Sequence, residues 1–207
     1  NMMAGVAAFR CLGCNFDDYH YALSSFKGIP HRLEWIKNIH GINYFNDSKA
    51  TNVASTVAAL NSFNNKDIIL IAGGDLKKQS LKPFIRTIKN NVKILILIGK
   101  DANIFKENTE RLSNLKIEMC QSMNDAVITA NNLAQKDDIV LLSPACASFD
   151  MYSNYIERGT PCTQHKTRTW SFAQSQQWPS IPRTGRTWRS RRHPRSAPPL
   201  VAPAAAR

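Results

Sequence analysis

Long apolar runs are scarce in this 207-residue chain. The longest, residues 68–72 and 94–98, are five residues each, whereas a membrane-spanning helix needs roughly 20 apolar residues. Short aliphatic runs of this kind are typical of strands that are buried on both faces. We therefore expect several buried strands and no membrane span.

Cysteines are few and follow no framework. There are five, an odd number, and the pair Cys11 and Cys14 has the spacing C-x-x-C. A zinc site would need a second pair, or histidines at ligand spacing, and neither follows. A redox pair would be expected beside a β-α-β unit, whereas this pair lies in an apolar, alanine-rich segment. We interpret the cysteines as reduced thiols of a cytosolic protein.

Acidic residues are absent from Thr160 onward. Residues 160–207 carry nine of the 27 basic residues, which leaves 18 basic and 15 acidic residues, a net charge of +3, in residues 1–159. The same segment holds seven of the ten prolines and shows no apolar periodicity. Its Arg, Pro and Ala differ from the Asn, Lys, Ile and Phe of the body, which fits a frameshift or a chimeric join better than an evolved module. We expect a disordered basic tail over residues 160–207.

Between these limits the chain alternates apolar strands with amphipathic helices. Strands are expected at 32–39, 42–45, 67–72, 93–98, 117–120 and 139–142, and helices at 2–12, 17–26, 52–63, 81–90, 102–113, 123–135 and 149–157. The first two strands flank His40-Gly41, which is typical of a β-hairpin with a two-residue turn. The pattern predicts a Rossmann-like α/β fold: a mostly parallel sheet with helices on both faces and a hairpin at its start.

The most informative turn is Asn46-Asp-Ser-Lys-Ala-Thr-Asn52, between a strand and a helix. A helix N-terminus offers unpaired N–H groups to an anion, and Thr51 or Asn52 can cap the helix. Asp47 and Lys49 add both signs of charge. We interpret this turn as a loop that handles a phosphate or a carboxylate. With the turns at 73–78 and 143–148, it follows a strand, where ligands of such sheets bind.

Four strings in order resemble the Mur ligases, and among them the enzymes that add D-glutamate. They are Phe26-Lys-Gly-Ile-Pro-His-Arg32, the turn 46–52, Ile71-Ala-Gly-Gly-Asp75 with Lys77, and Leu142-Ser-Pro-Ala-Cys-Ala-Ser-Phe-Asp150 followed by Glu157-Arg-Gly159. The resemblance implies that residues 1–26 end the family's central domain and that residues 27–159 form its C-terminal domain. Because the chain opens at Asn1 in a helix-like run, we expect a fragment, and no secretory signal opens it. The resemblance implies that the parent enzyme is bacterial and cytoplasmic.

The resemblance implies an ATP- and Mg²⁺-dependent amide ligase of peptidoglycan biosynthesis. Its substrates would be ATP, D-glutamate and UDP-N-acetylmuramoyl-L-alanine. ATP phosphorylates the muramoyl-alanine carboxylate, the amine of D-glutamate attacks the acyl phosphate, and phosphate leaves. Such chemistry needs cations that neutralise oxygens and a cradle that positions the amine.

The resemblance also assigns roles to individual residues. The residues expected to bind D-glutamate are Lys77, Thr51, Ser148 and Tyr155, and those expected to bind ATP are Arg32 and Asp47. Lys49, the expected catalytic residue, would contact the reacting phosphate or the product. Plainer readings exist: Lys77 as a solvated surface lysine, Ser148 as the N-cap of a helix at 149–157, and Asp47 as a turn-former.

Three parts of such a ligase are not found. No G-x-x-x-x-G-K-[ST] phosphate loop occurs, nor the central domain's metal site, nor the domain for the UDP group, so no metal ligand is assigned and we expect the chain alone to be inactive. Two alternatives remain. One is a basic nucleic-acid-binding module, in which tail arginines act with Trp170, Trp178 and Trp188. The other is a related ligase such as folylpolyglutamate synthase, against which the Ser143–Ser148 string speaks.

Overall fold

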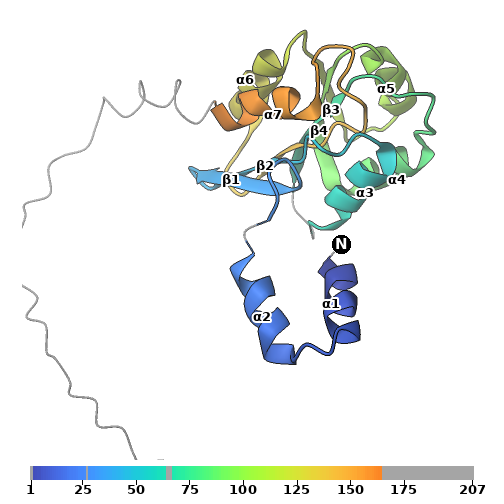
Figure 1. Ribbon diagram of the computed structural model, residues 1–207. Helices are drawn as coiled ribbons and strands as arrows, with labels where there is room; N and C mark the ends of the chain where they lie inside the picture. The colour runs from blue at the N-terminus through green and yellow to red at the C-terminus, as the bar shows by residue number, and fades with distance from the viewer. Residues whose placement is uncertain (1, 27, 64–66, 165–207) are drawn as a thin grey trace, which may run out of the picture.

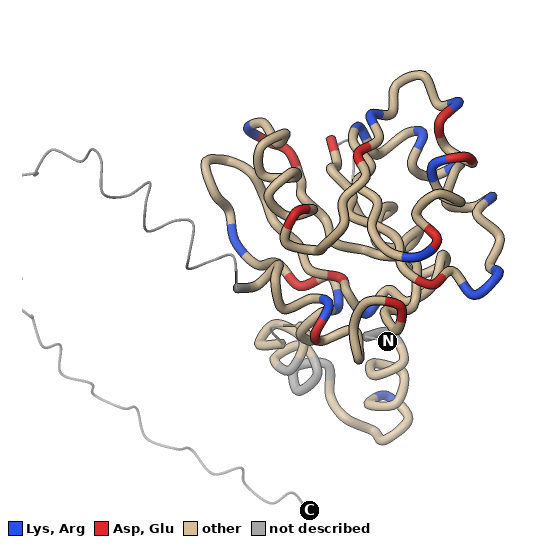
Figure 2. The backbone as a smooth tube through the Cα atoms, turned by 90° about the horizontal axis from the view of Figure 1, so that it is seen from above, with Lys and Arg blue, Asp and Glu red and all other residues tan. Residues whose placement is uncertain are grey.

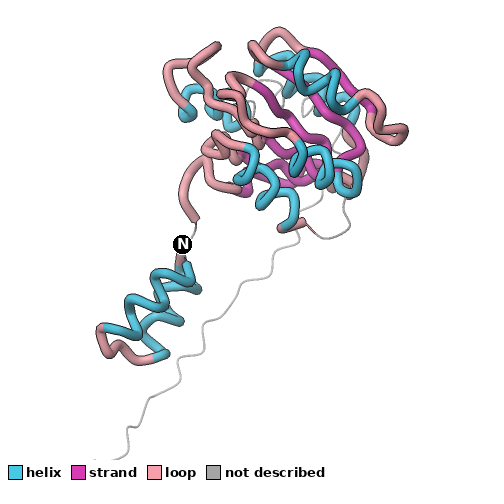
Figure 3. The backbone as a smooth tube through the Cα atoms, turned by 90° about the vertical axis from the view of Figure 1, so that its right-hand side faces the viewer, coloured by secondary structure: helices cyan, strands magenta, loops and turns pink. Residues whose placement is uncertain are grey.

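The computed structural model describes residues 2–26, 28–63 and 67–164, so the expected disorder of residues 165–207 lies outside the described part. Two short helices, α1 (Met2–Cys11) and α2 (Phe16–Ser25), lie side by side and apart from an α/β body (Figures 1 and 3). No helix among the described residues is long and apolar enough to cross a membrane. The five cysteines, all of them described, are free.

The body is built on a six-stranded sheet. Its strands are β1 (Glu34–Ile39), β2 (Ile42–Asn46), β3 (Ile68–Gly73), β4 (Val92–Ile98), β5 (Lys116–Met119) and β6 (Ile139–Leu142), in the order β1-β2-β6-β3-β4-β5. β1 and β2 pair antiparallel, and β2-β6, β6-β3, β3-β4 and β4-β5 pair parallel. The predicted mostly parallel sheet with an initial hairpin is confirmed.

The hairpin turn uses left-handed backbone at both of its central residues, His40 (φ 51°) and Gly41 (φ 86°). Turns of this kind match the twist of the two strands they join. The register of the hairpin shifts between Trp35 and Lys37. As a result Trp35 is exposed and Ile36 is buried.

Helices cover both faces of the sheet (Figures 1 and 3). They are α3 (Val53–Asn61), α4 (Lys82–Asn91), α5 (Ala102–Thr109), α6 (Met123–Leu133) and α7 (Tyr155–Gln164). One core cluster joins Leu95 of β4 to Phe84 and Phe105 of α4 and α5, whose rings meet edge to face at 5.2 Å. The other joins Ile96 to Met123 of α6. Alternate residues of each buried strand therefore pack into the two cores on opposite faces of the sheet, as expected of a sheet that is covered on both sides.

The last helix differs from the expectation of 149–157. It runs over Tyr155–Gln164, five residues into the segment expected to lack structure, and Cys162 packs against the second core. Asn154 Oδ1 accepts hydrogen bonds from the N–H groups of Ile156 and Glu157, and Glu157 Oε2 accepts one from Ser153. These reciprocal bonds form a capping arrangement that fixes the start of the helix.

Three loops now lie at one edge of the sheet. The β2 loop (46–52), the β6 loop (143–148) and the β3 loop (73–78) follow the neighbouring strands β2, β6 and β3. Because these strands are parallel, their carboxyl ends meet at the same edge. The loops singled out from the sequence are therefore adjacent.

Candidate functional site

The β2 loop carries buried polar side chains. Asn46 and Ser48 are fully buried, and Asp47 is only 8% exposed. Asn46 Oδ1 accepts the N–H of Ser48 at 3.0 Å, and its Nδ2 lies 2.9 Å from His31 Nδ1. Bonds of this local kind suit asparagine in turns. They fold the loop tightly and hold His31 beside it.

Asp47 links three segments of the chain. Its Oδ1 accepts the N–H of Leu33 at 3.0 Å, and its Oδ2 accepts the Ser143 hydroxyl at 2.8 Å. Burial raises the pKa of Asp47, while these two hydrogen bonds and the charge of Arg32 oppose that rise. The carboxylate is thus held in one orientation by the loops around it.

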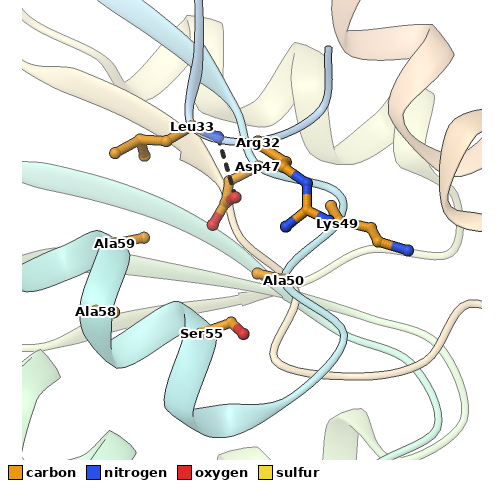
Figure 4. A pocket seen from close by; sticks show the side chains of 8 residues that line it. All are labelled: Arg32, Leu33, Asp47, Lys49, Ala50, Ser55, Ala58 and Ala59. Atoms are coloured by element: carbon orange, nitrogen blue, oxygen red, sulfur yellow. Dashed lines mark hydrogen bonds between the residues drawn. The ribbon is translucent and has the colours of Figure 1, made fainter. Parts of the chain in front are cut away.

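A cleft of about 480 Å³ opens beside Asp47; it is called the β2 cleft here. Its lining residues are Arg32, Leu33, Asp47, Lys49, Ala50, Ser55, Ala58 and Ala59 (Figure 4). The helix α3 starts at the cleft, where Asn52 caps it by accepting the Ser55 N–H at 2.9 Å. The cleft therefore combines a cation, a carboxylate, a helix start and a small apolar wall. Arg32, Asp47 and Lys49, which the sequence predicted to act on ATP, line this one space.

Lys49 points away from α3 (Figure 4). Its ammonium lies 4.0 Å from the centre of the Tyr155 ring, a cation–π contact, and the His31 ring meets Tyr155 edge to face at 5.9 Å. Lys49 thus connects the β2 cleft to Tyr155, one of the residues expected to bind D-glutamate. Thr51, another of them, is half-buried nearby, and its N–H donates to the carbonyl of Lys49 at 2.8 Å.

The β3 loop begins with two glycines that no other residue could replace without strain. Gly73 and Gly74 have φ values of 117° and 127°. A Cβ on Gly73 would lie 2.0 Å from the carbonyl oxygen of Ile98, and one on Gly74 would lie 2.4 Å from that of Ala147. The loop is therefore seated closely against β4 and the β6 loop.

Lys77 is exposed on this loop. Its ammonium lies 5.5 Å from the centre of the Phe149 ring, and Phe149 directly follows the buried Ser148. Ser148 does not cap the last helix, as a plainer reading expected, because that helix starts at Tyr155. The structure brings Lys77 to the segment of Ser148, but neither lines the β2 cleft. The expected site therefore has two parts, with Lys49 and Tyr155 between them.

Arg158 joins the loops, and the sequence did not reveal this role. It is 1% exposed; Nε and Nη2 donate to the hydroxyl and carbonyl of Ser48, and Nη1 donates to the carbonyl of Cys146. No carboxylate among the described residues forms an ion pair with it. Burial lowers the pKa of Arg158 to about 10, so it stays protonated at neutral pH. The sequence held one signal for this position, the motif Glu157-Arg-Gly159. Its glycine is needed because a Cβ on Gly159 would overlap the His31 ring.

The structure gives no support for a cysteine nucleophile or for a metal site formed by the described residues of this region. Burial raises the pKa of the Cys146 thiol to about 12, so it is a poor nucleophile. The described residues contain no group of three or more His, Cys, Asp or Glu side chains that could hold a metal ion.

Comparison with known proteins places this site in a family. The profile of the family described as Mur ligase, glutamate ligase domain, matches residues 31–146. Relatives named UDP-N-acetylmuramoylalanine–D-glutamate ligase are 41% identical over 158 residues in Nitrosomonas europaea, 44% over 137 in Methylobacillus flagellatus and 44% over 150 in Clostridium botulinum. These matches cover 76%, 66% and 70% of this chain but 33%, 30% and 32% of the relatives. The chain thus spans about a third of the length of the curated relatives that it matches.

Solved structures agree on the fold. UDP-N-acetylmuramate-alanine ligase MurC from Thermotoga maritima gives a TM-score of 0.53 at 11% identity, covering 80% of this chain and 36% of that one. MurF from Acinetobacter baumannii gives 0.51 at 18% identity, covering 70% and 34%. With the profile match spanning more than half of its residues, this chain belongs to the Mur ligase family and carries its glutamate ligase domain.

Proposed function

We propose that this chain is the C-terminal part of a bacterial, cytoplasmic ligase that adds D-glutamate to UDP-N-acetylmuramoyl-L-alanine, at the expense of ATP, in peptidoglycan biosynthesis. The observation that carries the proposal is the 41–44% identity to ligases of that name, within the segment that builds the site. The geometry supports it, because two groups of expected binding residues lie at one sheet edge, one around Arg32 and Asp47 and the other around Lys77. One suits a nucleotide and the other suits a small dicarboxylate.

The β2 cleft is the proposed ATP side. Arg32 would contact a phosphate, and the carboxylate of Asp47 would accept a hydrogen bond from the ribose. Each Asp47 oxygen already accepts one hydrogen bond and can accept another, so the residue fits this role. Mg²⁺ does not fit in the same way, because the described residues provide no cluster of metal ligands. We assign no step of the reaction to a metal ligand on this chain.

The surface between Lys77 and Tyr155 is the proposed D-glutamate side. Lys77 would pair with a carboxylate of the amino acid, and the hydroxyls of Ser148 and Thr51 would complete its binding with the Tyr155 ring. Held there, the amine is oriented toward the acyl phosphate, which replaces a diffusional encounter by a positioned one. Lys49, between the two sides, would neutralise charge on the reacting phosphate.

The alternatives are less well supported. Lys and Arg are interspersed with Asp and Glu over the body in Figure 2, whereas a nucleic-acid surface would gather basic residues on one face. The tail tryptophans and all the tail arginines lie outside the described residues. For a folylpolyglutamate-type ligase, the discriminating observation is the substrate.

The test is a fusion of this chain to the part of the Nitrosomonas europaea ligase that it does not match. We expect ATP-dependent phosphate release that requires both UDP-N-acetylmuramoyl-L-alanine and D-glutamate, and none from the 207-residue chain alone. L-Glutamate should not replace D-glutamate. Turnover with a folate and L-glutamate, but not with the muramoyl substrate, would move the chain to the folylpolyglutamate branch.

A further inference from the structure

Asp101 stands at the start of α5 but does not act as a helix cap. Aspartate is a preferred N-cap because its carboxylate can accept N–H groups of the first turn. Within α5, a fully described helix, the Asp101 side chain makes no capping hydrogen bond. Its Oδ2 instead accepts the N–H of Leu76 at 2.8 Å, across the sheet edge in the β3 loop. The usual explanation for an aspartate at this position therefore does not apply.

The β3 loop is held at several points along its backbone. The Asp101 N–H donates to the carbonyl of Gly74 at 3.1 Å, so Asp101 bonds the loop through main chain and side chain. On the other side, Asp75 Oδ1 accepts the N–H of Lys77 at 3.0 Å. Two consecutive N–H groups, those of Leu76 and Lys77, are thus each held by a carboxylate. A turn that only reversed the chain would not need this arrangement.

The backbone conformation explains why such support matters. Lys77 and Lys78 have φ values of 49° and 58°, in the left-handed region that residues other than glycine rarely occupy. Strained positions of this kind persist only where the surroundings fix them. In this conformation the Lys77 ammonium lies over the ring of Phe149, which follows Ser148 in the sequence.

The segment of Ser148 is tied to the same turn. Asp150 Oδ2 accepts the N–H of Lys100 at 2.8 Å, one residue before Asp101. Gly99 leaves the space for it, since a Cβ there would lie 2.5 Å from that carboxylate oxygen. The turn after β4 therefore bonds both the β3 loop, at the residue before Lys77, and Asp150, two residues after Ser148.

We propose that Asp101 is a positioning residue for D-glutamate binding, which rests on the function proposed above. It touches no substrate; it fixes the β3 loop so that the Lys77 ammonium stays over the ring of Phe149, the residue after Ser148. Loss of its carboxylate would remove the hydrogen bond to the Leu76 N–H, so the β3 loop and the Lys77 side chain would no longer be held in one position. The effect should fall on D-glutamate and leave ATP, which binds in the β2 cleft, unaffected.

The first arm of the test uses the full 207-residue chain and amide hydrogen exchange. In Asp101→Ala the Leu76 amide should exchange at least about ten times faster than in the wild type, because its acceptor is gone. Asp101→Asn keeps an oxygen acceptor and should stay near the wild type. The matched control is Asp125→Ala, another carboxylate at a helix start, which bonds Ser122 on α6 and should leave Leu76 unchanged. An unaltered exchange rate of the Leu76 amide in Asp101→Ala would overturn the proposal that Asp101 fixes the β3 loop.

The second arm uses steady-state kinetics of the fusion enzyme. Asp101→Ala should raise the KM for D-glutamate about 10-fold, with kcat and the KM for ATP changed less than about 2-fold, since misplaced binding groups weaken the step they serve. Asp101→Asn should recover most of the loss, and Asp125→Ala should show none. An equal rise in both KM values would indicate a general structural role and overturn the proposal. If the wild-type fusion shows no need for D-glutamate, the proposed function has failed, and the exchange arm still decides whether Asp101 holds the loop.

Discussion

The β2 loop and the β3 loop lie at the same edge of the sheet, but the first is fixed through its side chains and the second through its backbone. In the β2 loop the side chains of Asn46, Asp47 and Ser48 are at most 8% exposed and form hydrogen bonds, and Arg158 donates to the hydroxyl and carbonyl of Ser48. In the β3 loop Lys77 and Lys78 are exposed, and the backbone is what is fixed. The first loop is therefore part of the folded core, while the second presents a side chain to solvent.

This difference predicts where mutations act. A change in the β2 network should damage folding and binding together, because buried polar groups left without partners are costly. A change of an exposed side chain on the β3 loop should alter binding and spare stability. The following experiments test that separation, in order of decreasing effect.

Arg158→Ala should produce the largest loss of stability. It removes the donors to Ser48 and to the carbonyl of Cys146 and leaves a cavity, so we expect a loss of about 3–5 kcal/mol in the free energy of unfolding. Urea denaturation of the chain measures it. The control, Arg86→Ala on an exposed position of α4, should change stability by less than about 0.5 kcal/mol. A loss below about 1 kcal/mol for Arg158→Ala would show that the network is dispensable.

Gly73→Ala should break the β3 loop through its backbone. The added methyl group would overlap the carbonyl oxygen of Ile98 at a φ of 117°, and we expect a loss of about 2–4 kcal/mol. Gly5→Ala in α1 is the contrasting change, because no atom outside its surroundings in the helix lies within 4 Å of the new methyl group. It should be neutral or stabilise the helix by up to about 1 kcal/mol. Equal losses at both positions in urea melts would contradict the close seating of this loop.

Lys77→Ala and Asp47→Ala should have opposite kinetic effects in the fusion enzyme. Removing a cation that faces a carboxylate costs about 1.5–3 kcal/mol, or about 10- to 150-fold, and Lys77→Ala should show this in the KM for D-glutamate. Asp47→Ala should affect ATP more than D-glutamate. Each substrate is varied in turn to measure the two constants. If Lys77→Ala instead weakened ATP alone, the β3 loop would be a nucleotide loop and the assignment would be reversed.

The smallest effect concerns pH. Burial raises the pKa of Asp47, so the protonated form favours the folded state; its contribution to stability is fully present below the pKa of an unfolded aspartate and is lost as the pH rises through the folded-state value. Asp47→Asn should therefore gain stability relative to the wild type as the pH rises from about 4 to 7. Urea midpoints over that range provide the measurement, with the exposed Asp67→Asn as control. A relative gain toward acid pH would mean that hydrogen bonds, not burial, dominate at Asp47.

Much of the fold was readable in the sequence. The aliphatic runs of β3 and β4 could only be buried strands, and His40-Gly41 between two apolar runs defined the hairpin. Asn52 was predicted as a possible cap and is one. These signals are local, since each depends on a few consecutive residues whose conformations have few alternatives.

The last helix was expected at 149–157, directly after Ser148, but it starts at Tyr155. The sequence did contain the correct signal for its start: Asn154 is followed three residues later by Glu157, the pattern of a capping arrangement. Arg158 is different, because two of its hydrogen bonds reach Ser48, 110 residues away in the sequence, and no local pattern predicts a contact of that range. The Arg-Gly motif marked the residue but did not identify its partners.

The contact between Arg158 and Ser48 also bears on how the protein is made. A ribosome synthesises the β2 loop more than a hundred residues before Arg158. The hairpin can pair as soon as it emerges, but β2 must wait for its neighbour β6, and the loop must wait for the helix that follows it. During translation the proposed ATP side of the domain therefore stays unassembled until nearly the whole body has been produced. A chain released before Arg158 would contain every strand of the sheet, but its β2 loop would lack the hydrogen bonds from Arg158.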